Sequence, residues 1–106
     1  MTRRLLTDFE IMILLAILRV GDDAYGVTIA REIESTAGRA VQLPAVYTAL
    51  ERLETQGLVR SWLGDATPQR DGRAKKHFAL TRTGLGSVQD TRQALTALWS
   101  HLPQLS

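Results

Sequence analysis

Positively charged side chains gather in one stretch of the 106-residue chain, between residues 58 and 82. Six basic side chains occur there with only two acidic ones, a local net charge of +4: Arg60, Arg70, Arg73, Lys75, Lys76 and Arg82 against Asp65 and Asp71. Residues 1–57 hold six basic and eight acidic side chains, a net charge of −2, so the overall charge of +2 hides this asymmetry. A basic stretch of this kind can contact several phosphates of a nucleic acid at once. A solvated basic hairpin that binds nothing is the alternative interpretation.

The residue types needed for catalysis or metal binding are scarce and scattered. The two histidines, His77 and His101, lie in different predicted elements, and neither has a pair of carboxylates close by in the sequence. Cysteine is absent, and no glycine-rich stretch matches a phosphate-binding loop. We therefore expect no enzymatic activity, no metal and no other cofactor, and we expect His77 to be a surface residue of a strand.

A helix with marked ends precedes the basic stretch. Pro44 suits a first helical position, and Gly57 can adopt the left-handed conformation that terminates a helix. Apolar residues recur at three- and four-residue spacing and form the packing face: Val46, Leu50 and Leu53. Five residues remain for the other faces: Ala45, Thr48, Ala49, Arg52 and Gln56. Because those near the start are small or hydroxylated, this helix could approach the floor of a DNA major groove, with a plain surface helix as the alternative.

Two strand patterns follow this helix, at residues 58–63 and 76–80. Asp71 and Gly72 can supply a tight turn between them. Trp62, in the first strand, is expected to lie in the core or at an interface. The helix and the hairpin together predict a mostly α-helical α+β fold, a winged helix-turn-helix in which the hairpin is the wing.

The first helix of the helix-turn-helix is predicted over residues 25–36, ending before Gly38. Tyr25 and Thr28 lie at its start, where backbone amides are also free, so their hydroxyl groups are candidates to hold a DNA phosphate. For Tyr25, a partly buried packing role is the equal alternative. Residues 38–43 alternate in a way that favours a short extended segment, a candidate to pair with the wing strands.

Another helix is predicted near the N-terminus. It begins at Thr7, where Glu10 three residues later completes a capping box, and it ends near Val20. This helix is apolar on nearly all sides, so the protein's own core can cover only part of it. A second copy of the chain is the simplest cover for the rest, with Phe9 and Ile13 in the dimer interface.

The last helix is predicted to start after Thr81, as its cap, and to continue to about Leu102. Its apolar residues recur mainly at spacings of three, four and seven: Leu85, Val88, Leu95, Leu98, Trp99 and Leu102. This stripe extends beyond the core and is expected to complete the dimer interface. We therefore predict one compact domain, with residues 1–81 as the DNA-binding winged helix-turn-helix and residues 82–106 as the dimerisation helix.

Length and composition set further bounds on the protein. A chain of this size suits a single modest core. The absence of cysteine excludes disulfides and fits a reducing cytoplasm. The first apolar run includes Asp8 and Glu10 and has no cleavage site, so we expect no secretory signal. Residues 11–18 are continuously apolar, but a membrane-spanning helix needs about 20 residues, so we expect no membrane contact.

Four segments carry a family resemblance by their order and separation: AYGVTIAREI, VYTALERLETQGLV, WLGD and DGRAKKHFALTRTGL. On these segments the chain resembles the small members of the PadR family of bacterial transcriptional regulators, over nearly its whole length. The resemblance implies a homodimer that binds double-stranded DNA, in a family whose members are mostly repressors. It also matches Tyr47 to the family's helix tyrosine, which implies a contact with a DNA phosphate.

The resemblance also raises the question of a ligand. Some PadR members bind planar drugs between tryptophans of the C-terminal helix, which makes a small planar molecule a candidate inducer. The matching position here is Leu95, and Trp99 lies one turn later, so we expect Trp99 to pack in the interface, with ligand stacking as the alternative.

The mechanism we expect is a dimer that places two copies of the helix at residues 44–56 in successive major grooves, about 34 Å apart, on a roughly palindromic operator. Ala45, Thr48 and Arg52 are the residues of this helix that we expect to contact the DNA. The wing would hold the DNA backbone through its cations: Arg70, Arg73, Lys75 and Lys76. A winged module that binds a protein partner and a ligand-sensing domain that does not read DNA are the alternatives.

Overall fold

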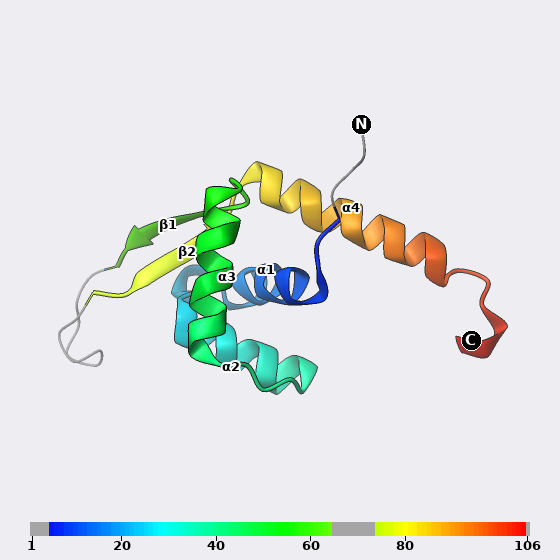
Figure 1. Ribbon diagram of the computed structural model, residues 1–106, viewed down its shortest axis with the longest axis horizontal. Coiled ribbons are helices and arrows are strands. Elements are labelled where there is room, and N and C mark those ends of the chain that lie inside the picture. The colour runs from blue at the N-terminus through cyan, green and yellow to red at the C-terminus, as the bar shows by residue number, and fades with distance from the viewer. Residues whose placement is uncertain (1–4, 65–73, 106) are drawn as a thin grey trace.

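The computed structural model describes residues 5–64 and 74–105, and in those ranges it contains four α-helices, a two-stranded sheet and two short 3₁₀ turns (Figure 1). The elements follow in the order α1 (Asp8–Val20), η1 (Gly21–Asp23), α2 (Gly26–Ala37), α3 (Leu43–Thr55), β1 (Val59–Leu63), β2 (Lys76–Leu80), α4 (Arg82–Trp99) and η3 (Pro103–Leu105). Helices α2 and α3 form the helix-turn-helix and the β1–β2 hairpin forms the wing. The predicted fold class is confirmed.

Local sequence signals fix the ends of α1 and α3. The Thr7 hydroxyl accepts the Glu10 backbone N–H at 3.2 Å, and the Glu10 carboxylate accepts the Thr7 N–H at 2.8 Å, which is the predicted capping box. At the end of α3, Gly57 takes a φ of 77°. The N–H of Leu58 then donates to the carbonyl of Leu53. This bond ends the helix, and it requires the left-handed conformation that Gly57 adopts just before Leu58.

The core lies where α1, α2 and α3 meet, and the hairpin and the first half of α4 close it (Figure 1). Its largest fully buried side chains come from the three helices: Ile13, Leu14, Ile29, Val46, Leu50 and Leu53. Ile13 has no exposed surface, so it packs inside its own protomer and cannot reach a partner. The prediction that it lies in a dimer interface is wrong. Phe9, half-buried, packs against the edge of this core.

The hairpin pairs with the start of α2 and not with the segment before α3. Strands β1 and β2 are antiparallel, with Trp62 opposite His77. Tyr25 forms a bridge with His77, and the Phe78 N–H donates to the carbonyl of Ala24 at 2.9 Å. The expectation that residues 38–43 pair with the wing is therefore wrong for the part of the chain described, because residues 24 and 25 occupy that edge.

Helix α4 has a buried first half and an exposed second half. Thr81 caps it by accepting the Gly84 N–H at 3.0 Å, as predicted, and Val88 and Thr91 are buried against the body. The helix ends at Trp99, not near residue 102, because Pro103 disfavours helical geometry in the residue before it and His101 takes a φ of 61°. Figure 1 shows α4 extending beyond the other helices. None of the described helices is both long and apolar enough to span a membrane.

Candidate nucleic-acid interface

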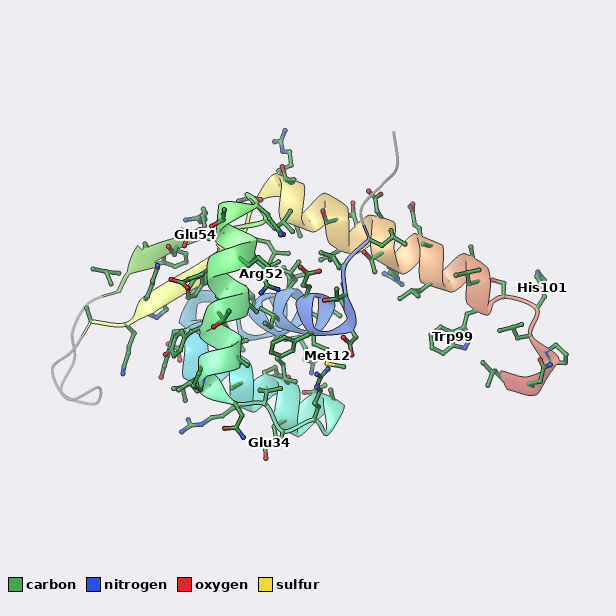
Figure 2. The ribbon with its side chains drawn as sticks, viewed as in Figure 1. Met12, Glu34, Arg52, Glu54, Trp99 and His101 are labelled. Carbon is green, nitrogen blue, oxygen red and sulfur yellow. The ribbon has the colours of Figure 1, made fainter. Side chains whose placement is uncertain are left out.

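The outward face of α3 carries three of the predicted DNA-contacting residues. Ala45, Thr48 and Arg52 are exposed and follow one another at spacings of three and four, so they share one side of the helix (Figure 2 labels Arg52). Ala49 is different, since only 7% of its surface is exposed. It follows Val46 by three residues and belongs to the packing face, which corrects the expectation that it lies on another face.

Tyr47 links α3 to the N-terminus of α2. A Cβ atom built at Gly26 would lie 2.5 to 2.6 Å from the Tyr47 ring and hydroxyl, so the ring packs directly on the glycine backbone. Yet 44% of Tyr47 remains exposed. The exposed part of the Tyr47 side chain therefore lies beside the first turn of α2, where backbone amides lack carbonyl partners within the helix. This is the arrangement in which a phosphate oxygen can be bound.

The hydroxyl group of Thr28 forms hydrogen bonds with the protein's own backbone and is not available to a ligand. Its hydroxyl oxygen accepts the Tyr25 N–H at 3.0 Å, and its single proton is shared between the carbonyl oxygens of Asp23 at 2.6 Å and Tyr25 at 3.0 Å. A hydroxyl group has one proton to donate, so Thr28 has none left for a phosphate. The structure contradicts its predicted role as a phosphate contact and gives it a role in shaping the start of α2.

His77 is another residue whose predicted place was wrong. It is 95% buried, not on the surface, because it lies between the hairpin and the start of α2. Its ring stacks on Trp62, and the ring of Tyr25 meets it edge-on with centroids 5.5 Å apart. Tyr25 is half-buried in this contact, which favours the packing alternative for Tyr25.

Polar contacts fix the orientation of the His77 ring. Nδ1 lies 3.0 Å from the carbonyl oxygen of Lys75, and since a carbonyl only accepts, Nδ1 is the donor. On the other side, Nε2 lies 3.7 Å from a carboxylate oxygen of Asp23. A Cβ atom at Gly64 would come within 2.4 Å of the ring, so a glycine is needed opposite it. Trp62 faces His77 across the hairpin, and large cross-strand neighbours cover one another. Pairing the two predicted strands in this register would have indicated that the His77 ring is covered.

The cations of the wing differ in their surroundings. Arg70 and Arg73, together with the predicted Asp71–Gly72 turn, lie outside the described residues. Lys75 is half-buried, whereas Lys76 is exposed and its Nζ lies 3.6 Å from a carboxylate oxygen of Glu54 on α3.

A further wing cation was not among the predicted contacts. The Arg60 guanidinium lies over the Trp62 ring at 4.9 Å from its centroid. Trp62 is thus covered by His77 of β2 and by Arg60 of its own strand, β1. It is still 37% exposed, so it lies on the surface of the wing and not in the core.

A family model covers this whole arrangement. The model of the transcriptional regulator PadR-like family matches residues 14–90, which include α2, α3, both wing strands and the start of α4. The chain belongs to the PadR-like family. It is thus a transcriptional regulator of a DNA-binding family, a class of proteins that is generally not enzymatic.

Solved structures of PadR proteins share the fold. A PadR family transcription regulator from Clostridium difficile R20291 is 23% identical, with a TM-score of 0.73, covering 93% of this chain and 98% of that one. A PadR-like transcriptional regulator from Bacillus cereus strain ATCC 14579 is 20% identical, with a TM-score of 0.73, over 92% and 89% of the two chains. The protein in a complex structure of hsRosR-S1 is 27% identical, with a TM-score of 0.71, over 93% and 80%. A search among curated protein sequences gave no match.

Proposed function

We propose that this PadR-like protein is a homodimeric repressor that reads a roughly palindromic DNA operator. The observation that carries the proposal is the exposed face of α3 with Ala45, Thr48 and Arg52. Thr48 and Arg52 line a groove together with Lys76 of the wing, and Tyr47 of the same helix packs on Gly26 at the start of α2. A helix flanked on both sides by groups that can bind phosphates suits insertion into a major groove. The repressor role itself rests on the family resemblance.

Phosphate contacts would come from two directions. On one side the Tyr47 hydroxyl and the first amides of α2 would hold one backbone strand. On the other side Arg70, Arg73, Lys75 and Lys76 of the wing would meet the flanking backbone, and their charge would make binding depend on salt. Tyr25 and Thr28 would act indirectly, by shaping the start of α2.

Exposed apolar surfaces support dimerisation. On α4, Leu95, Leu98 and Trp99 are 46%, 74% and 62% exposed, and on α1 Leu15 and Leu18 are 43% and 47% exposed. Figure 2 shows Trp99 at the end of α4, apart from the three-helix body. Such a stripe at the end of a projecting helix is most simply covered by the apolar face of α1 in a second copy.

A hollow beside Trp99 supports a small apolar inducer as an additional feature. Ile11 and Leu15 of α1 and Val88, Leu95 and Trp99 of α4 line it, and its volume is about 240 Å³. A planar ligand that enters this hollow would alter how α4 lies against α1. Because α4 would set the distance between the two copies of α3, the ligand would weaken operator binding.

Fluorescence anisotropy and mobility shift with the upstream region of the protein's own gene test the proposal. We expect saturable binding of one dimer that survives unrelated competitor DNA and weakens as salt rises. Equal, weak binding to every duplex would refute a sequence-reading role and favour the protein-binding alternative. Quenching of Trp99 fluorescence by a ligand, with no binding to any DNA, would instead favour the ligand-sensing alternative.

A further inference from the structure

An acidic side chain lies in the groove where the proposed DNA backbone would run. The groove separates α3 from the wing and is lined by Thr48, Glu51, Arg52, Glu54, Thr55 and Lys76. Figure 2 shows Glu54 on the side of α3 that faces the hairpin. Two carboxylates therefore stand beside the basic wing, in a place that a DNA-binding surface would normally keep free of negative charge.

Glu54 is held in place by both wing strands. Its Oε2 accepts the Ser61 hydroxyl of β1 at 2.6 Å, and its Oε1 lies 3.6 Å from Nζ of Lys76 on β2. The Glu54 side chain is only 35% exposed, and the Lys76 side chain is 50% exposed. The carboxylate is thus fixed by the serine and pointed at the lysine, whereas the lysine remains accessible from solvent.

A phosphate that approached Lys76 would meet the Glu54 carboxylate as a competitor. The ammonium group can pair with either anion, and each phosphate contact it makes displaces the favourable interaction with Glu54. The carboxylate would also repel the phosphate, and in a groove between two protein surfaces this repulsion is screened less than on an open surface.

We propose that Glu54 is an intramolecular competitor of DNA phosphate for Lys76, and that it sets the affinity and the salt dependence of DNA binding. This inference rests on the proposed DNA-binding function. It assigns to an acidic residue of α3 the role of weakening DNA binding by the groove. Apart from Glu51, the other described residues of this groove are neutral or basic. By keeping Lys76 paired in the free protein, Glu54 lowers binding to all duplexes, including unrelated ones.

The substitution Glu54→Gln tests this role directly. Glutamine keeps the shape and can still accept the Ser61 hydroxyl, but it carries no charge to pair with Lys76. We expect DNA affinity to rise about two- to fivefold at 0.1 M salt, as for the loss of a partly exposed ion pair. The slope of log affinity against log salt should steepen by up to about 0.9, the value for one phosphate contact, because Lys76 no longer divides its pairing between Glu54 and the phosphate.

Glu51→Gln is the matched control, because Glu51 lines the same groove one turn away and makes no ion pair with the described residues. It removes the same charge without touching Lys76 and should leave the salt slope unchanged. In a Lys76→Met background, Glu54→Gln should give a smaller gain and no steeper slope, because only the repulsion between Glu54 and the phosphate is then removed. Urea unfolding of each variant checks that the fold is intact.

The outcomes distinguish a failure of the Glu54 role from a failure of the DNA-binding function. If wild type and Glu54→Gln both bind the operator with equal affinity and slope, or if Glu51→Gln gives the same gain, the role of Glu54 is refuted while the DNA-binding function stands. If the full gain and the steeper slope persist with Lys76→Met, the competition for Lys76 is refuted. If neither wild type nor any variant binds a specific duplex, the proposed function itself fails.

Discussion

The imidazole ring of His77 stacks on the indole ring of Trp62, with centroids 5.8 Å apart and ring planes 19° apart. The two residues face each other across the hairpin, and Tyr25 at the start of α2 meets the same imidazole edge-on. A wing attached to the body only through its strand ends could swing relative to α3. These ring contacts join it to the helix-turn-helix, so the position of the wing cations relative to α3 is set by packing.

His77→Ala should lower the free energy of unfolding by about 1–3 kcal/mol, because it leaves a cavity between the hairpin and α2. Urea denaturation followed by circular dichroism measures the change. His101→Ala is the control, since His101 is exposed, and it should leave stability within about 0.5 kcal/mol of wild type. Equal stabilities for the two variants would show that the ring contacts contribute nothing.

Two glycines of α4 should respond in opposite directions to the same substitution. A Cβ at Gly84 would lie 2.0 Å from the carbonyl oxygen of Leu58, a backbone atom, whereas a Cβ at Gly86 has nothing within 4 Å. Gly84→Ala should therefore destabilise the protein by about 1–3 kcal/mol through overpacking. Gly86→Ala should stabilise it by up to about 1 kcal/mol through helix propensity. Urea unfolding of both variants decides this, and a neutral Gly84→Ala would mean that α4 does not approach the Leu58 backbone so closely.

The features that the sequence predicted are those that depend on neighbouring residues. The Thr7–Glu10 capping box, the Gly57 terminus and the Thr81 cap each involve residues within five positions of one another, and all three form as expected. Helix periodicity likewise placed Ala45 and Thr48 on the outward face. These signals are local, so they do not require knowledge of the tertiary fold.

The features that the sequence missed depend on contacts between distant segments. His77 is buried because residues 24 and 25 come to lie against the hairpin, about fifty positions earlier in the chain. Ile13 is enclosed because α1 packs in the core among α2, α3, β2 and α4. An apolar helix shows that two sides need covering, but the sequence alone does not show which side faces the core and which faces solvent.

Glu32 on α2 should titrate below the ordinary range of a glutamate. The Thr36 hydroxyl donates to its carboxylate and Arg19 of α1 donates at 2.8 Å, and both lower the pKa of Glu32 below 4.5. Because the pKa is lower in the folded state, this contribution to stability is present above pH 4.5 and is lost as pH falls through the lowered value. Nuclear magnetic resonance titration of the Glu32 carboxyl carbon measures the pKa.

Thr36→Val should move that midpoint upwards, towards the ordinary value. Ser35→Ala is the control, because the Ser35 hydroxyl donates to the Glu32 backbone carbonyl at 3.4 Å and not to its carboxylate. It should leave the midpoint where it is in wild type. A midpoint at the ordinary value in wild type would show that the Thr36 and Arg19 contacts do not persist in solution.

Leu98→Asp should dissociate the proposed dimer without unfolding the protomer. Leu98 is 74% exposed in the single chain, so a charge there costs the fold little, but it would enter the proposed interface twice. Burying one such apolar side chain stabilises the dimer by about 1.5–3 kcal/mol, and the substitution removes this at two positions. The dimer dissociation constant should therefore rise about 100-fold or more. Sedimentation equilibrium measures it. Gln93→Asp, on another exposed face of α4, should have no such effect, and an unchanged dimer in Leu98→Asp would exclude this end of α4 from the interface.

Tyr47→Phe tests whether the Tyr47 hydroxyl makes an uncharged hydrogen bond to a DNA phosphate. The variant keeps the ring that packs on Gly26 and loses only the hydroxyl, so the fold should be unchanged. Loss of one hydrogen bond should weaken binding about two- to tenfold for all duplexes alike. The salt slope should stay the same, because a hydroxyl group releases no counterion.

Lys75→Met gives the contrasting result in the same assay. Removing a cation that meets a phosphate should also weaken all sequences alike, but it should reduce the salt slope by about 0.9. Fluorescence anisotropy on operator and unrelated duplexes at several salt concentrations distinguishes the two. If Tyr47→Phe weakened only the operator, Tyr47 would contact a base and α3 would lie deeper in the groove than proposed. If Lys75→Met left both affinity and slope unchanged, the wing would meet the DNA through its other cations.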